Sequence, residues 1–548
     1  MVCIQSPEMC GVPGWPIPVH LNGPPPDSTM TTLQQGKLVW AGGPVTGPEV
    51  EWPTEAVDMT EKIKTLLHPY LGQLGLSNGI CVEFLGEGAW NRVFSITGAK
   101  SDTGNQDLLP PEYVLRICLP VYPWYKVEAE VATIQFVRER TTIPAPPVYV
   151  YDSSSDNALG YEWILMGKVS GEPFLNVRDS FSLEELKSVA QTVAEWSDQL
   201  SRLRFFDEIG SLYLDHSKRA IRPGRPVCQD FMADWRHDYS FRRGPFWNMH
   251  EFVRSFIDCD GAELHDPRQR LRGDLDEEYD KILELKQMIK AEQDPNKTQE
   301  LLLRLQQLEQ QYTERLTLPE IKNSAVDFET YRYCSRSCKE ATNLARLGEL
   351  VDRCFPKEIL PPGPVVLEHW DMSEGNVMVD PTSKNATGLI DWEQLHTVPF
   401  SLISTRYPSI MQRDNGFPDL PEPPTPSVDT LTLGDDDGED DYVSEKSFDE
   451  IFWENQVMRE AFDQRLRELG SPWLQVGQDS KDEAGGVGRR TMVYDIGDND
   501  LCSRCMKYHP DMVENAEAQR ELHELVRSGG NYCVGRLEKI ESFLACDV

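Results

Sequence analysis

The stretch VVLEHWDMSEGNVMVDPTSKNATGLIDWEQLHTVPF, residues 365–400, decides the fold. It contains Asp371, then Asn376, and then Asp391 after a short intervening segment. The apolar residues that follow Asn376 and those that precede Asp391 predict two strands joined by a turn. Because such a hairpin brings its two open ends together, we expect the amide of Asn376 and the carboxylate of Asp391 to lie close in space. Both groups offer the hard oxygen ligands that Mg²⁺ prefers.

The spacing of His369, Asp371 and Asn376, with Asp391 after the next strand, is that of the catalytic loop and metal-binding aspartate of protein kinases. Phosphoryl transfer needs a carboxylate that holds the acceptor hydroxyl in line and oxygen ligands for the metal that bridges the phosphates. Asp371 is therefore the candidate catalytic carboxylate, and Asn376 and Asp391 are the candidate metal ligands. A loop of turn and capping residues is the alternative interpretation. We expect the His369 ring to pack beneath this loop.

The segment before this stretch, residues 81–169, predicts a small antiparallel sheet with one helix. The strand order is CVEFLGEGAW, NRVFSITG and YVLRICLP, then the helical VEAEVATIQFVRERT, then IPAPPVYVYD and YEWILMGKV. A helix that ends at Pro69 precedes the sheet, and the pattern after Gly171 is mainly helical. Capping boxes at Ser182 and Ser447, each with glutamate three residues later, mark two of the helices.

Several phrases, in this order, resemble the aminoglycoside phosphotransferase family of kinase-like enzymes, in its large fungal branch. They are LGEGAWNRVF, YVLRICLP, EAEVATIQFVRERTTIPAPPVYVYD, WILMGKVSGEPF, HWDMSEGNVMVD and GLIDWE. The resemblance implies an α+β, protein-kinase-like bilobal fold, with a small antiparallel-sheet N-lobe and a large, mainly helical C-lobe that carries a helical-hairpin insertion. It implies an ATP-dependent phosphotransferase that moves the γ-phosphate to a hydroxyl of a small molecule, with ATP and Mg²⁺ as cofactors.

The resemblance also implies roles for residues outside the catalytic stretch. Gly86 and Gly88 would lie in the loop over the nucleotide, where a missing side chain lets backbone N–H groups approach phosphates. Arg116 stands where such kinases place a phosphate-pairing lysine, and Glu130 would orient it from a helix. Met166 would lie at the hinge beside the adenine. Arginine and lysine are not interchangeable at such a position, because the guanidinium is a planar fork and the ammonium is a point charge.

Three further positions adjoin the catalytic stretch. Trp370 stands where the family usually has glycine, and we expect both Trp370 and Trp392 to pack rather than to bind a ligand. Glu393 could contact a metal ion or have a role that does not involve metal, and the sequence leaves both possibilities open.

The chain divides by composition and period into three parts. Residues 1–53, rich in Pro and Gly, predict an arm without regular structure. Residues 54–168 form the predicted N-lobe and residues 169–548 the predicted C-lobe. The C-lobe would contain the catalytic loop 367–393, a helical-hairpin insertion at 268–318 and an acidic, Pro-rich loop at 412–446.

Two apolar seams at helical spacing give the hairpin at 274–316, which could bind a protein partner. The acidic run at 435–441 predicts a solvated loop. Cys502 and Cys505, with a histidine four residues further on, resemble half of a zinc site.

Charge and composition limit the kinds of partner that the protein could bind. The chain has 54 Lys and Arg against 90 Asp and Glu, a net charge of −36. This charge argues against nucleic acid and allows a cationic acceptor. No apolar run is long enough to span a membrane, no targeting segment is recognisable, and 13 scattered cysteines do not suggest a disulfide framework. We therefore expect a cytoplasmic protein with no membrane partner.

Two other functions stay open. One is a catalytically weak or inactive kinase-like module that binds a nucleotide or a partner, which Arg116 favours. The other is a protein kinase. Two features argue against it: residue 370 is not arginine, and no A-P-E segment follows Asp391.

Overall fold

The computed structural model of the 548-residue chain describes most of the predicted kinase-like region. The described residues are 59–99 without 77, 78 and 89, 112–265 without 204–205, 216–219 and 233, 295–316, 365–399, 407–411 and 446–474, with short pieces at 17–18, 39–41, 49–51, 281–282, 285–286, 288–289, 420, 423–424, 431–433 and 442–444.

A six-stranded sheet forms the N-terminal half, in the order β1-β7-β8-β6-β5-β4. Its strands are β1 Ile17–Pro18, β4 Ile80–Glu87, β5 Asn91–Gly98, β6 Tyr113–Cys118, β7 Val148–Asp152 and β8 Glu162–Gly167. All neighbours pair antiparallel except β1 and β7, which are parallel. The five strands from β4 to β8 confirm the sheet predicted from the sequence.

The expectation that residues 1–53 lack regular structure is wrong at three places. Strand β1 pairs with β7, and β2 Val39–Ala41 pairs with β3 Glu49–Glu51. Strand β7 would otherwise end the sheet with unpaired backbone donors and acceptors, and such an edge readily accepts another strand. Periodicity could not have predicted a two-residue strand whose partner lies more than a hundred residues away.

Helix α3, Tyr125–Arg140, is buried on all sides. Its apolar residues, such as Val127 and Val131, are buried as predicted, but so are Lys126, Glu128 and Glu130. The helix lies between the sheet and strand β10, Leu212–Asp215, which belongs to the C-terminal half. Buried charges need partners, so these three residues must be paired inside the molecule.

The C-terminal half is mixed rather than only helical. It contains α4 Phe174–Val177, α5 Leu183–Ser201, α6 Gln229–Met232, α7 Met249–His265, α9 Pro295–Leu316 and α13 Phe448–Glu468. Its strands are β9 Glu172–Pro173, β10, β11 Ala220–Pro223, β12 Val365–Leu367, β13 Val377–Val379, β14 Ala386–Leu389, β15 Thr397–Pro399, β16 Leu431–Leu433 and β17 Tyr442–Ser444.

The short 3-10 helices are η3 His68–Tyr70, η4 Arg178–Ser180, η5 Asp234–Asp238, η7 Ser409–Met411 and η8 Pro472–Leu474, and α2, Thr60–Leu67, precedes the sheet.

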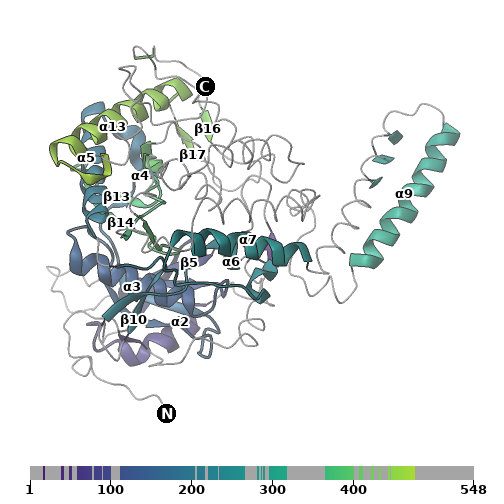
Figure 1. Ribbon diagram of the computed structural model, residues 1–548, viewed down its shortest axis with the longest axis horizontal. Coiled ribbons are helices and arrows are strands. Elements are labelled where there is room, and N and C mark those ends of the chain that lie inside the picture. The colour runs from purple at the N-terminus through teal and green to yellow at the C-terminus, as the bar shows by residue number, and fades with distance from the viewer. Residues whose placement is uncertain are drawn as a thin grey trace.

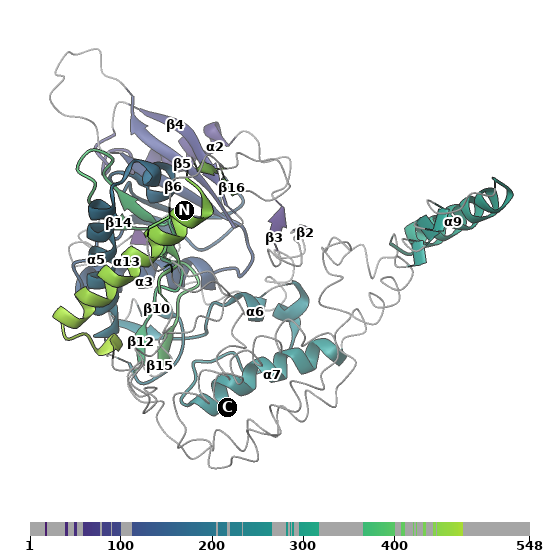
Figure 2. The same ribbon diagram turned by 90° about the horizontal axis from the view of Figure 1, so that it is seen from above.

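Helices α5 and α13 lie side by side in both views (Figures 1 and 2). Both begin with the predicted capping boxes, at Ser182 and Ser447. An ion pair of 2.7 Å between Arg465 and Glu195 joins the two helices.

A single apolar cluster runs from the sheet into the C-terminal half. It includes Val131 of α3, Ile164 of β8, Val193 of α5, and Val377 and Leu389 of the hairpin formed by β13 and β14. Each fully buried aliphatic side chain of this kind stabilises the fold by roughly 1.5–3 kcal/mol. The hairpin that carries the candidate site is therefore anchored in the shared core.

Helix α9 extends away from the rest of the molecule in both views (Figures 1 and 2). Leu301 and Leu305 are half-buried, whereas Leu302 and Leu303 are exposed, as expected for one seam of a helical hairpin. This confirms the second helix of the predicted insertion. The start of the insertion, the acidic run 435–441, and Cys502 and Cys505 lie outside the described residues.

None of the helices in the described part of the chain has the length and apolar character needed to cross a membrane.

Candidate active site

The hairpin of β13 and β14 brings the predicted polar residues together. Strand β13 pairs antiparallel with β14, and the N–H of Ile390 donates to the carbonyl of Asn376 at 3.0 Å. The second strand begins at Ala386, earlier than the predicted apolar pair at its end. Asn376 and Asp391 therefore leave the same end of one hairpin, as its spacing predicted.

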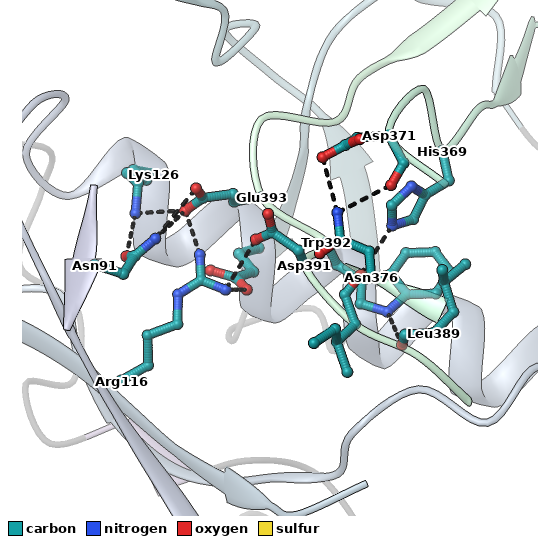
Figure 3. A network of polar contacts seen from close by, with 12 residues as sticks. Asn91, Arg116, Lys126, His369, Asp371, Asn376, Leu389, Asp391, Trp392 and Glu393 are labelled. Atoms are coloured by element: carbon teal, nitrogen blue, oxygen red, sulfur yellow. Dashed lines mark hydrogen bonds and ion pairs between the residues drawn. The ribbon is translucent and has the colours of Figure 1, made fainter. Parts of the chain in front are cut away.

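Asp371 and Asn376 contact each other directly. The Asn376 amide donates to the Asp371 carboxylate at 2.8 Å and to its backbone carbonyl at 3.1 Å (Figure 3). Burial raises the pKa of Asp371, although the amide of Asn376 opposes the shift. Because the Nδ2 of Asn376 is used in this way, its Oδ1 is left for another ligand.

The residues around Asp371 have different roles. His369 is buried, its Nε2–H donates to the carbonyl of Ile390 at 3.2 Å, and its ring meets Trp392 edge-on at 4.8 Å. Burial lowers its pKa to about 4, so the ring is neutral at pH 7 and packs beneath the loop as expected. Trp392 is fully buried and packs, as predicted. The same expectation for Trp370 is wrong, because 60% of this residue is exposed beside Asp371.

Asp391 sits at a bend just after β14. Its backbone has φ of 62°, a region in which aspartate is tolerated better than most residues. Gly388 lets β14 pass close to Val169 and Pro144 just before this bend. A Cβ at Gly388 would lie 2.5 Å from the Val169 side chain and 2.6 Å from the carbonyl oxygen of Pro144. The Asp391 side chain remains 35% exposed, so one carboxylate is accessible at this point of the site.

Arg116 lies on β6, in the interior of the sheet, and reaches three carboxylates. Its Nη1 donates to Glu130 at 2.7 Å and to Asp391 at 3.2 Å, and its Nη2 contacts Glu393. The sequence predicted that Arg116 and Glu130 would pair, and they do. The structure also brings Arg116 to Asp391 (Figure 3). Strand β6 lies between β8 and β5, so Arg116 is not on an edge of the sheet.

The sequence did not predict that Lys126, Asn91 and Glu393 would contact one another in the site. Lys126 lies 2.6 Å from Glu393, and its ammonium donates to the Asn91 Oδ1 at 2.8 Å. The Asn91 amide donates to both Glu393 oxygens, at 3.2 and 3.0 Å. A signal did exist for Lys126: it precedes Glu130 by four residues, so both lie on one helix face. Glu393 contacts cations of the protein, which favours the role without metal.

The site contains more acidic side chains than basic ones. Three carboxylates, of Glu130, Asp391 and Glu393, surround the two cations Arg116 and Lys126. Burial opposes ionisation of Glu393, but the two cations outweigh it and lower its pKa. Burial and the charge of Glu393 raise the pKa of Asp391, so this carboxylate binds a proton or another cation readily.

The remaining predicted residues line the sheet. Gly86 lies on β4 one residue before its end, Gly88 follows in the turn to β5, and Met166 lies on β8 between β6 and β7. A Cβ at Gly86 or Gly88 would meet nothing within 4 Å, so the packing of the protein does not require glycine at either position. Among the residues that the structure describes, no side-chain hydrogen bond or ion pair joins these three residues to the charged cluster.

The profile of the phosphotransferase enzyme family matches residues 82–401, more than half of the chain. The chain belongs to this phosphotransferase family. This confirms the resemblance drawn from the motifs, and the matched range contains every candidate site residue of the phosphotransferase.

Curated relatives match a smaller part of this family member. A subtelomeric hrmA-associated cluster protein of Aspergillus fumigatus is 33% identical over 151 residues, 27% of each chain. Altered inheritance of mitochondria protein 9 of Debaryomyces hansenii, a mitochondrial protein, is 30% identical over 140 residues, 24% of this chain and 21% of its own. The matches thus span about a quarter of these relatives.

Solved structures of aminoglycoside phosphotransferases are more distant. APH(4)-Ia aligns over 85% of this chain and 99% of its own, with 15% identity and a TM-score of 0.31. The streptomycin and ATP complex of APH(2")-IIa aligns over 61% of this chain and 72% of its own, with 13% identity and a TM-score of 0.26. A likeness at this level carries no argument about function.

Proposed function

We propose that this chain is an ATP- and magnesium-dependent phosphotransferase that transfers the γ-phosphate to a hydroxyl of a small molecule. One observation carries the proposal: Arg116 on β6 contacts both Glu130 on α3 and Asp391 after β14. Asn376, at the other open end of the same hairpin, holds Asp371 in the loop before β13 (Figure 3). A phosphate-binding cation, a metal-binding carboxylate and an acceptor-directed carboxylate are the parts that phosphoryl transfer requires.

Arg116 is the proposed phosphate-binding residue. Glu130 holds one of its terminal nitrogens, and its Nε–H has no hydrogen-bond partner among the described residues. A buried donor without a partner is costly, and a phosphate oxygen would satisfy it. Guanidinium groups suit this ligand because they donate in pairs to phosphate.

Asn376 and Asp391 are the proposed metal ligands. Among the residues that the structure describes, no three His, Cys, Asp or Glu side chains converge to hold a metal by themselves. Mg²⁺ does not need such a set, because it is usually held by one or two protein oxygens together with phosphates and water. The accessible Asp391 carboxylate and the Asn376 Oδ1 fit that pattern, and a bound cation would relieve the excess of carboxylates. When bound, the metal would neutralise charge on the phosphates.

Asp371 is the proposed residue for the acceptor. Asn376 fixes its carboxylate, and burial raises its pKa toward the range in which a carboxylate can accept a proton from a hydroxyl. Asp371 would orient the hydroxyl and take up its proton as the hydroxyl oxygen bonds to the γ-phosphorus, while the bond from that phosphorus to the bridging oxygen breaks and ADP leaves.

The proposed nucleotide-binding residues, acceptor class and cellular location are those expected from the sequence. Gly86 and Gly88 would cover the phosphates and Met166 would lie against the adenine, with residues 54–168 as the nucleotide-binding lobe. The net charge of −36 suits a cationic acceptor. The four described cysteines are free thiols, in keeping with the proposed reduced, cytoplasmic setting.

A second function is an inactive kinase-like module. The observation that favours it is that both terminal nitrogens of Arg116 already contact carboxylates. In such a protein the arginine would be a structural cross-link between the two halves.

The test is whether Mg²⁺ and ATP together raise the melting temperature, since a ligand that binds only the native state stabilises it. We expect stabilisation that requires both components and that Asp391→Ala abolishes. A library of hydroxyl-bearing metabolites assayed for ADP release then identifies the acceptor. Binding without turnover on any acceptor would support an inactive module that binds a nucleotide. No stabilisation at all would refute the phosphotransferase and leave only a module that binds no nucleotide.

A further inference from the structure

Glu393 lies between the two cations of the site and contacts both. Its Oε2 is 2.6 Å from the Lys126 ammonium and also accepts from the Arg116 Nη2. Asn91 completes the group by donating to both Glu393 oxygens and accepting from Lys126 (Figure 3). These residues come from β5, β6, α3 and the segment after β14, so the group joins both halves of the molecule.

All four side chains are buried, with exposed fractions of 9% or less. A buried charge is tolerated only when it is paired and hydrogen-bonded, because it has lost its hydration. Lys126 supplies the charge that balances Glu393, and Asn91 fills hydrogen-bonding positions of both. Without Lys126, Arg116 alone would face the three carboxylates of the cluster.

This arrangement holds the guanidinium of Arg116 at both ends. Glu130 accepts from Nη1 and Glu393 accepts from Nη2, so the plane of the fork is fixed. An ammonium has a single nitrogen, and one carboxylate is enough to orient it. An arginine in the same place needs a second carboxylate, and a second carboxylate in a buried site needs a second cation.

We propose that Glu393, held by Lys126 and Asn91, is the positioning residue that allows an arginine to serve as the phosphate-binding cation of this site. The inference rests on the proposed function, and Lys126 acts through Glu393 rather than on the nucleotide.

The first measurement is the affinity for Mg²⁺ and ATP by calorimetry in three variants of the full chain: Glu393→Gln, Lys126→Met and the two combined. Each single variant leaves a buried charge without its partner, and loss of such a charged hydrogen bond should weaken binding about 10-fold to 100-fold. The double variant removes the pair as a neutral unit, so its loss should be smaller than the product of the single losses. The control, Glu195→Gln with Arg465→Met, removes an ion pair between α5 and α13 and should leave the affinity within about 2-fold.

The second measurement compares Arg116→Lys in two backgrounds. In the wild type this change leaves Glu393 without its arginine, and binding should weaken about 10-fold or more. In the Glu393→Gln and Lys126→Met background Nη2 has lost its carboxylate, whereas Glu130 and Asp391, which both contact Nη1, remain. A single point of attachment suits the lysine ammonium, so the same change should cost little or improve binding. A purely structural pair would not make the effect of Arg116→Lys depend on Glu393.

Equal losses from Arg116→Lys in both backgrounds, or single losses that multiply in the double variant, would overturn the inference while leaving the proposed function intact. If the single variants do not fold, the Arg116→Lys comparison decides, because it uses only the wild type and the charge-balanced double variant. Absence of Mg²⁺ and ATP binding by the wild type would overturn the proposed function and the inference together.

Discussion

Glu162 should make the stability of this protein fall as the pH rises. It lies on β8 with 2% exposure, and its carboxylate accepts the N–H of Trp124 at 2.7 Å, just before α3 begins. Burial raises its pKa from 4.5 to about 8, although the Trp124 hydrogen bond and Lys126 oppose the shift. Because α3 carries Lys126 and Glu130, the buried carboxyl acts at the entry to the helix that positions the charged cluster.

The sign and size of the effect follow from proton linkage. Between about pH 4.5 and pH 8 the folded protein holds a proton on Glu162 that the unfolded chain has released. The free energy of unfolding therefore decreases with rising pH, by up to about 1.4 kcal/mol per pH unit from this group alone. From pH 5.5 to 7.5 the loss should be about 2.5 kcal/mol, and it should level off above about pH 8.

Glu162→Gln removes this titration and keeps an oxygen that can accept the Trp124 N–H. Urea unfolding followed by circular dichroism at pH 5.5, 6.5 and 7.5 should show a slope less negative than that of the wild type by about 1.4 kcal/mol per pH unit. Glu128→Gln is the comparison, because burial raises the pKa of Glu128 only to about 7. The contribution of Glu128 to the pH dependence of stability should therefore end at a lower pH than that of Glu162. Identical slopes for the Glu162→Gln variant and the wild type would refute the raised pKa and the reasoning from burial.

Asp371→Asn should reduce turnover by about 100-fold or more while the stabilisation by Mg²⁺ and ATP stays close to that of the wild type, since the carboxylate addresses the acceptor; loss of that stabilisation would contradict the role. Trp370→Ala should change the free energy of unfolding by less than about 0.5 kcal/mol, because the ring is exposed, and should raise the KM for the acceptor found by screening; a large loss of stability would show that the ring packs. Deletion of residues 274–316 with a short flexible linker should leave a cooperative calorimetric transition and intact ATP binding, because α9 extends away from the core (Figure 2); loss of the transition would place these helices in the main core.

The sequence determined the features whose residues are close along the chain. The hairpin that joins Asn376 to Asp391, the capping boxes at Ser182 and Ser447 and the succession of strands β4 to β8 along the chain follow from local spacing and hydrophobic period. Such signals are readable because a turn or a helical repeat fixes the geometry of residues only a few positions apart.

Only the tertiary structure decided which charges meet. Asn91 and Glu393 lie 302 residues apart in the sequence, and no periodicity relates them. In the sequence Lys126 is one more charged residue of an amphipathic helix. It became a partner of Glu393 because α3 is buried on both sides, and a charge buried in that way must find a counter-charge across the interior. Trp370 shows the converse: an aromatic residue expected to pack is exposed, because packing depends on neighbours that folding brings in from elsewhere in the chain.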